Sequence, residues 1–198
     1  MSRIICLIVG YAFGNLLTAE LVVWIKLRKH PEDLGSGNPG MANVTRQLGI
    51  YAGILVLAGD ILKTVLACLL CNRLFPLPQN LSTLYAGLGA ILGHNFPVWK
   101  HFKGGKGVAV TCILLVLYSP PWGLAACIIG LLFILLTGYL PLGAVVIPTA
   151  FLIYTFLSYG AEVILLILAV TVLMFVKHAP GLRDISQGTC PKVSFFRH

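Results

Sequence analysis

Residues that could bind an anion gather first in a glycine-rich segment, residues 35–46, which reads GSGNPGMANVTR. Closely spaced glycines permit tight turns in which backbone N–H groups can approach an anion. Ser36, Asn38 and Asn43 can add side-chain hydrogen bonds, and Arg46 supplies a planar guanidinium suited to phosphate. An ordinary loop between two helices would need neither the paired asparagines nor the arginine. We therefore predict an anion site here.

A second glycine-rich segment, residues 93–107, reads GHNFPVWKHFKGGKG and leads directly into an apolar run. Its glycines and two lysines, Lys103 and Lys106, would bring backbone donors and the positive end of a helix dipole to a phosphate. The GxxxxGK[ST] spacing of a Walker A loop is absent. His94 can equally be a buried structural histidine, and Lys100 can be a charge that only sets membrane orientation.

Ionisable residues also occur inside apolar runs. Asp60 and Lys63 are three residues apart, so on a helix they share a face and can pair. Charges at membrane depth are costly and indicate function by default, but a structural ion pair that orients the first segment fits equally well. Glu20 is a weaker case of the same kind. His178, near the end of the last apolar run, can be a ligand or an interfacial residue.

The elements that must position these residues are membrane helices. Of 198 residues, 58% are hydrophobic and 10% are charged, whereas soluble domains contain about 25% charged residues. We predict an all-α, polytopic membrane protein that forms one domain over residues 1–198 and has about seven short transmembrane helices. The predicted spans are Ile4–Ile25, Leu48–Cys71, Leu81–Phe96, Gly107–Tyr118, Trp122–Thr137, Leu140–Leu157 and Ala161–Val176. The third and fourth are the shortest, and one of them could be a re-entrant or broken helix.

Positive charge follows this division into spans. Seven spans place eleven Lys and Arg residues on one side and two, Arg3 and Arg73, on the other, with Lys63 inside a span. The eleven are Lys26, Arg28, Lys29, Arg46, Lys100, Lys103, Lys106, Lys177, Arg183, Lys192 and Arg197. Since positive charge accumulates on the cytoplasmic side, we predict an outside N-terminus and a cytoplasmic C-terminus. Both glycine-rich segments would then face the cytoplasm.

Several other classes are disfavoured. The net charge of +8 is scattered over short loops, which argues against nucleic acid as a partner. Cys68 and Cys71 form a single CxxC without a second pair, so a metal or redox site is not indicated. The first apolar run lacks a small-residue cleavage site and continues to Trp24, so we interpret it as a retained span.

Together the two segments resemble the integral-membrane acyl-phosphate:glycerol-3-phosphate acyltransferases, the PlsY family of bacterial phospholipid synthesis. Residues 36–46 match the first motif of that family, SGNxGxxNxxR, at every fixed position. Residues 93–109 match its second motif, GHxFPxxxxFxGGKGVA, and Asp60 and Lys63 match as well. The resemblance covers the whole chain in length and in number of spans.

The resemblance implies transfer of a fatty acyl group from acyl phosphate to the 1-hydroxyl of glycerol 3-phosphate, giving lysophosphatidic acid and phosphate. It implies a multi-pass protein of the bacterial inner membrane, with its active site at the cytoplasmic face, an acyl chain that enters from the inner leaflet, and no metal or other cofactor. The donor is already activated, so no Ser or Cys nucleophile is required. The implied catalytic residues are Ser36, Arg46, His94, Lys106 and His178. The implied substrate- and phosphate-binding residues are Gly37, Asn38, Gly40, Asn43, Lys103, Gly104, Gly105, Gly107 and Arg183, with Asp60 and Lys63 as a structural ion pair.

The chain departs from the family pattern in a third motif. After His178, Gly181 replaces an Asn, Asp184 replaces an Arg and Cys190 replaces a closing Glu, while Arg183 could compensate for the lost Arg. Pro141 stands where the family has a Ser before its sixth span. These changes would alter the half of the site that binds glycerol 3-phosphate and leave the acyl-phosphate half intact.

Two alternatives therefore stay open beside the acyltransferase. One is a paralogue that acylates another acceptor or has lost activity, which the altered third motif favours. The other is a small transporter for an organic phosphate, which the scarcity of ionisable residues in the spans disfavours. The acyl chain length, the catalytic base and the oligomeric state do not follow from the sequence.

Overall fold

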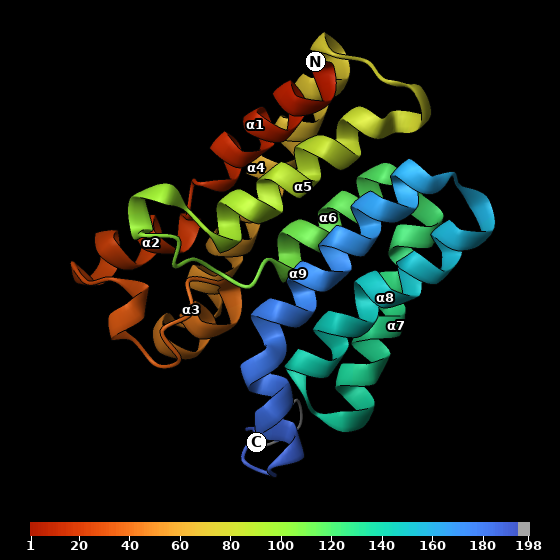
Figure 1. The fold of residues 1–198 in the computed structure, drawn as a ribbon. Coiled ribbons are helices and arrows are strands. Elements are labelled where there is room, and N and C mark those ends of the chain that lie inside the picture. Colours follow the sequence, from red (N-terminus) through yellow and green to blue (C-terminus); the bar gives the residue numbers. More distant parts are fainter. Residues whose placement is uncertain (194–198) are drawn as a thin grey trace. The chain divides into compact units, whose positions relative to one another are not determined.

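The computed structural model describes residues 1–193, and every regular element in this range is a helix (Figure 1). The α-helices are α1 Ser2–Gly14, α2 Thr18–Leu27, α3 Met41–Leu48, α4 Ile50–Leu74, α5 Leu81–Asn95, α6 Val108–Tyr118, α7 Pro120–Thr137, α8 Leu140–Ser158 and α9 Ala161–Ser186. Three short 3₁₀ helices, η1 Pro31–Asp33, η2 Pro78–Asn80 and η3 Val98–Lys100, lie in the connections. The all-helical prediction is confirmed for these residues. Arg197, which the charge count includes, lies outside them.

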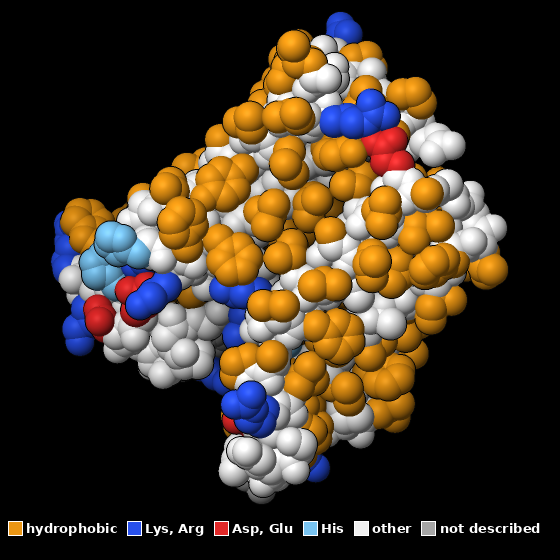
Figure 2. All heavy atoms as spheres, in the orientation of Figure 1, with side chains coloured by type: hydrophobic (Ala, Val, Ile, Leu, Met, Phe, Trp, Pro, Cys, Tyr) orange, Lys and Arg blue, Asp and Glu red, His pale blue; other side chains and the backbone are white. Residues whose placement is uncertain are grey.

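The surface of these helices suits a lipid environment. Hydrophobic side chains cover much of the face shown in Figure 2, and Leu136 and Leu157 are each 84% exposed. Five helical segments are long and apolar enough to cross a membrane, namely Ser2–Leu27, Ile50–Leu74, Pro120–Thr137, Leu140–Ser158 and Ala161–Ser186. The other two predicted spans form α5, of 15 residues, and α6, of 11 residues. Seven membrane crossings therefore stay a prediction.

The first predicted span is not one continuous helix, because it breaks between α1 and α2. Asn15 stabilises the break: its amide nitrogen donates to Tyr11 O at 2.7 Å, and its amide oxygen accepts from the backbone N–H of Val98 at 3.0 Å. The hydropathy of the run hid this break, since its few polar residues, Asn15, Thr18 and Glu20, do not interrupt the long apolar stretch.

Two segments predicted as loop or tail are helical. Met41–Leu48 forms α3, bounded by Gly40 and by Gly49, whose φ of 87° ends the helix in a conformation that favours glycine. The last helix continues past the predicted end at Val176 to Ser186, with Pro180 inside it. Hydropathy marks where the apolar part of a helix ends, whereas the backbone hydrogen bonds of α9 continue beyond it.

The chain divides into two compact units, Met1–Leu114 and Leu115–His198. In the first unit, α1, α4 and α5 pack against one another (Figure 1). The α1–α5 contact is made through small residues: a Cβ at Gly10 would lie 1.9 Å from Ala86 O, and one at Gly89 would lie 2.1 Å from Leu7 O. Such close backbone approach is typical of membrane helices with glycine at their interface, and here it anchors α5.

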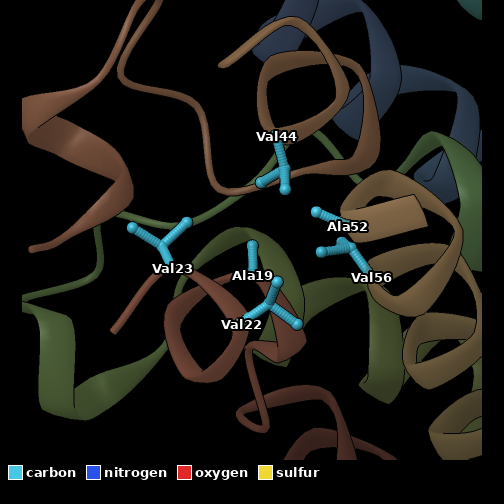
Figure 3. Close-up of a cluster of buried hydrophobic side chains, with 6 residues drawn as sticks. All are labelled: Ala19, Val22, Val23, Val44, Ala52 and Val56. Atoms are coloured by element: carbon cyan, nitrogen blue, oxygen red, sulfur yellow. The ribbon is translucent and has the colours of Figure 1, made fainter. Parts of the chain in front are cut away.

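A small hydrophobic cluster in the first unit supports α3. The side chains point toward one another from three helices in Figure 3: Ala19, Val22 and Val23 from α2, Val44 from α3, and Ala52 and Val56 from α4. Burial of apolar surface therefore fixes α3, and with it the second half of the first glycine-rich segment, against the longer helices.

In the second unit, α8 packs against both α7 and α9. The α7–α8 contact again uses small residues, since a Cβ at Gly130 would lie 2.2 Å from Ile147 Cγ1 and one at Gly143 would lie 2.6 Å from Gly130 O. Beyond α9, the backbone N–H of Val193 donates to Gly138 O at 2.8 Å, which returns the described end of the chain to the α7–α8 turn.

Candidate active site

The first glycine-rich segment is shaped by Asn43, whose side chain is buried on α3. Its Oδ1 accepts from the backbone N–H of Ser36 at 3.0 Å, and its Nδ2 donates to Leu34 O at 2.9 Å. Gly35 has a φ of +52°, and a Cβ there would lie 2.6 Å from Asn43 Oδ1. Asn43 therefore folds the segment back onto α3, while its direct contact with phosphate stays a prediction.

This fold leaves the polar groups of the segment accessible. Ser36 and Arg46 are exposed, and Asn38 is half-buried. Gly37 has a φ of +72°, and the backbone N–H of Gly40 donates to Asn38 O at 2.9 Å. Hydroxyl, amide, guanidinium and backbone groups thus lie along one short stretch of chain, as a phosphate site requires.

The second glycine-rich segment packs onto the C-terminal end of α5. The backbone N–H of Gly104 donates to Asn95 O at 3.2 Å, and that of Gly105 donates to His94 O at 2.9 Å. A Cβ at Gly105 would lie 2.1 Å from His94 Nε2. Gly107 has a φ of +76°, and a Cβ there would lie 2.6 Å from Asn95 Oδ1. The glycines are thus required by close packing as well as by the turn, and α6 starts immediately after them, as predicted.

Beneath this segment lies a buried polar network centred on Lys63 of α4. Lys63 Nζ lies 2.8 Å from Asp60 Oδ1, donates to Leu16 O at 2.8 Å and is 2.9 Å from His94 Nδ1. Leu16 lies in the break between α1 and α2, where backbone carbonyls lose their helical partners. The network therefore joins α4, the helix break and the end of α5 that supports the second segment.

The network also defines the hydrogen-bonding state of His94. With Lys63 protonated, its ammonium group has donors and no acceptor, so His94 Nδ1, which also lies 3.6 Å from Asp60 Oδ1, accepts from it. The ring proton then lies on Nε2, the nitrogen that faces Gly105. His94 can thus offer a hydrogen bond toward the glycine-rich segment from a side chain that is only 3% exposed.

The two segments meet at a cavity of about 450 Å³, lined by Glu32, Gly37, Pro39, Lys103 and Gly104. The structure therefore brings together parts of both predicted phosphate sites. Across residues 1–193, the side chains of Arg46, Lys103 and Lys106 form no hydrogen bond or ion pair with another side chain. Their charge is available to an anion.

Lys100, in contrast, forms ion pairs. Its Nζ lies 2.7 Å from Glu20 Oε1 and 3.3 Å from Glu32 Oε1. Partial burial alone would lower the pKa of Lys100, but hydrogen bonding and charge attraction from Glu20 and Glu32 outweigh it and raise the pKa above its usual value. Sequence reasoning missed Glu32, which carries no signal beyond its place in a loop, and gave Glu20 little weight.

The remaining predicted site residues lie in the second unit. His178 is buried on α9, and its Nδ1–H donates to Met174 O at 3.0 Å, while Arg183 is exposed one turn further on. Gly181 faces the ring of Pro141, since a Cβ at Gly181 would lie 2.7 Å from Pro141 Cγ. In the part of the chain that the structure describes, no three His, Cys, Asp or Glu side chains are arranged to hold a metal ion.

The buried network generates a stability prediction. Lys63→Met would leave the Asp60 carboxylate buried without its counter-charge, which typically costs about 3–5 kcal/mol. We expect thermal unfolding in detergent to shift down by roughly 10 °C for a chain of this size. Asp60→Asn in combination with Lys63→Met should recover part of the loss, because no charge then stays unpaired, but Leu16 O still lacks its donor.

Arg73→Met is the matched control, since Arg73 is an exposed cation on the same helix. Its unfolding temperature should stay close to that of the unaltered protein. Equal unfolding temperatures for Lys63→Met and Arg73→Met would show that the network does not hold the helices together.

Comparison with known proteins shows the family of the chain. The sequence model of the glycerol-3-phosphate acyltransferase family matches residues 4–188, across both units. The chain is 39% identical over 193 residues to "Glycerol-3-phosphate acyltransferase 1" of Lactobacillus johnsonii, covering 98% of this chain and 93% of that protein. It is 32% identical over 192 residues to "Glycerol-3-phosphate acyltransferase" of Bacillus subtilis, covering 97% and 96%.

A solved structure gives the same result. The crystal structure of PlsY (YgiH), an integral membrane glycerol 3-phosphate acyltransferase in its glycerol 3-phosphate form, superposes with a TM-score of 0.87 at 28% identity, covering 98% of this chain and 96% of that one. A polytopic membrane protein is therefore confirmed, and the predicted resemblance is correct. The chain belongs to the glycerol-3-phosphate acyltransferase family.

Proposed function

We propose that this protein transfers a fatty acyl group from acyl phosphate to the 1-hydroxyl of glycerol 3-phosphate in phospholipid biosynthesis. The products are lysophosphatidic acid and inorganic phosphate. The observation that carries the proposal is the cavity at which both glycine-rich segments meet, with Lys103 in its wall; on the same two segments, Arg46 and Lys106 form no ion pair within residues 1–193. Family membership supports the acceptor, and the likeness to PlsY supports acyl phosphate as the donor.

The chemistry requires positioning and charge stabilisation. The acceptor hydroxyl attacks the acyl carbonyl carbon and a C–O ester bond forms. The bond from that carbon to the phosphate oxygen breaks, and the hydroxyl proton ends on the departing phosphate. The departing phosphate takes the electron pair, so negative charge grows where the donor phosphate is bound. Backbone N–H groups of the two segments, with the helix start at α6 and the unpaired lysines, are suited to hold that charge. They would also offset the repulsion between the two substrate phosphates.

The exposed hydrophobic side chains of the helices support the proposal that the acyl chain enters the site from the membrane. We place the protein in the inner membrane of a bacterium, as the organisms of its relatives suggest, with both segments at the cytoplasmic face. The distribution of Lys and Arg supports that orientation.

Activity should depend strongly on Lys106, because this lysine lies between the glycines that lead into α6. Removing one group that stabilises transition-state charge typically costs about 100- to 1,000-fold in rate. We expect a loss of at least that order for Lys106→Ala when purified protein, acyl phosphate and labelled glycerol 3-phosphate are followed for lysophosphatidic acid and phosphate.

Lys29→Ala serves as the control, since Lys29 is an exposed lysine on the same predicted side of the membrane. It should keep activity within about threefold, in line with the small worth of exposed charges. If the unaltered protein formed no lysophosphatidic acid, the proposed reaction would be rejected. Equal and mild losses of activity in both variants would mean that the second segment only sets the orientation of the protein in the membrane and does not act in the reaction.

Orientation is tested separately. We expect a cytoplasmic reporter fused after His198 to be active and a periplasmic reporter at the same position to be inactive, because seven crossings with the excess of Lys and Arg inside require a cytoplasmic C-terminus. Activity of the periplasmic reporter would contradict either the number of crossings or the cytoplasmic face of the site.

The third motif gives a prediction about the acceptor. Asn at position 181 cannot be restored alone, because its Cβ would lie 2.7 Å from Pro141 Cγ and 3.2 Å from Pro141 Cβ. Gly181→Asn should therefore destabilise the protein, whereas Gly181→Asn with Pro141→Ser should fold normally. A hydrogen bond to a charged group is worth about 1.5–3 kcal/mol, so the double variant should lower the KM for glycerol 3-phosphate by roughly tenfold to a hundredfold. The KM for acyl phosphate should stay the same.

Gly160→Asn is the control, since a side chain at Gly160 meets open space in the same unit. An unchanged acceptor KM in a stable double variant would mean that α9 does not contact glycerol 3-phosphate. The paralogue with a different acceptor would then become the better hypothesis.

A further inference from the structure

Lys100 is the cation that joins the elements around the cavity. It ends η3, in the second glycine-rich segment, and its Nζ lies 2.7 Å from Glu20 on α2 and 3.3 Å from Glu32 on η1. The side chains of Lys100 and Glu20 are each only 11% exposed, whereas Glu32 is 48% exposed. One lysine thus connects the second glycine-rich segment to α2 and η1, which precede the first glycine-rich segment in the chain.

Glu20 extends the connection. Its Oε2 lies 2.9 Å from Nδ1 of His30, the residue that precedes η1, and the backbone N–H of His30 donates to Asp33 Oδ2 at 3.1 Å. The turn that carries Glu32 is therefore held at both ends, by Lys100 on one side and by Glu20 through His30 on the other.

Glu32 is an unfavourable residue for a cavity that binds phosphate. It lines the cavity together with Gly37 and Lys103, where its carboxylate would repel an anion. Pairing with Lys100, which also pairs with Glu20, offsets part of that repulsion, so that the charge of Lys103 can act on the ligand. The ion pair thereby affects the charge of the cavity. It also affects the distance between η1 and the second glycine-rich segment, which both line the cavity.

We propose that Lys100 is a positioning residue of the acyl transfer reaction, which offsets part of the charge of Glu32 and holds η1 against the second glycine-rich segment so that the cavity accepts a phosphate group. This inference rests on the proposed function, in that the phosphate is that of the acyl donor. Lys100 acts through Glu32 and Glu20 and does not itself contact the donor.

Coupling between Lys100 and Glu32 distinguishes this role from a purely structural ion pair. Lys100→Met exposes the cavity to the unneutralised carboxylate, so the KM for acyl phosphate should rise by about tenfold or more while kcat changes less. Adding Glu32→Gln to Lys100→Met should recover most of that increase. Glu32→Gln alone should change the KM by less than about twofold, and Lys100→Arg should keep it near the original value.

Inorganic phosphate provides a second readout that does not depend on turnover. Phosphate should raise the unfolding temperature of the unaltered protein, and Lys100→Met should need about ten times more phosphate for the same shift. Lys29→Met, which removes an exposed lysine elsewhere, should respond like the unaltered protein. If no acyl transfer occurs but these phosphate responses do, the proposed function fails while the charge role of Lys100 stands.

Three results would overturn the inference. One is an unchanged donor KM and phosphate response in Lys100→Met. Another is an increase in KM that Glu32→Gln does not reduce, since the carboxylate would then not be its cause. The third is that Lys100→Met and Lys100→Gln both fail to fold while Lys100→Arg folds, which would make the ion pair a requirement of the fold alone.

Discussion

The ammonium group of Lys63 lies inside an apolar helix, and the arrangement of the first unit depends on how that charge is compensated. A buried cation is tolerated only if its donors are satisfied and an opposite charge is close. Asp60 supplies the charge, and Leu16 O and His94 Nδ1 accept hydrogen bonds. The acceptors come from a helix break and from the end of another helix, so compensating one charge fixes three elements at once.

That constraint explains why irregular backbone can exist at this depth. Free carbonyls in an apolar environment cost several kcal/mol each, by order of magnitude, and are tolerated where the protein itself satisfies them. Lys63 donates to the carbonyl of Leu16, and Asn15 bonds to both Tyr11 and Val98. The break between α1 and α2 thus makes a second contact with the segment that follows α5. The glycines at positions 104 and 105 then pack on the same end of α5, which leaves their segment little freedom to move.

The sequence predicted the helices well because long apolar runs have few other stable forms in a membrane. It also singled out the two glycine-rich segments that meet at the cavity, while their role in binding substrate stays a prediction. It missed the break after Gly14, the helix α3 and the length of α9. Each of these depends on hydrogen bonds or packing with distant residues, such as Asn15 with Val98 or Val44 with α2 and α4. Glu32 was missed for the same reason, because only its partner Lys100 gives it meaning.

The positions of the Asp and Glu residues distinguish the lysines that hold helices together from the cations of the candidate site. The chain has only six Asp and Glu residues against fourteen Lys and Arg. Three of the acids, Glu20, Glu32 and Asp60, pair with Lys100 and Lys63. A fourth, Asp33, accepts from the backbone of His30 in the same turn. Three of the four acids of the first unit are therefore paired with two lysines that hold elements together, and none of the four pairs with Arg46, Lys103 or Lys106 among the described residues. Among residues 1–193, Lys103 in the wall of the cavity thus has no paired carboxylate, and this selective pairing supports the proposal that the cavity binds an anionic group.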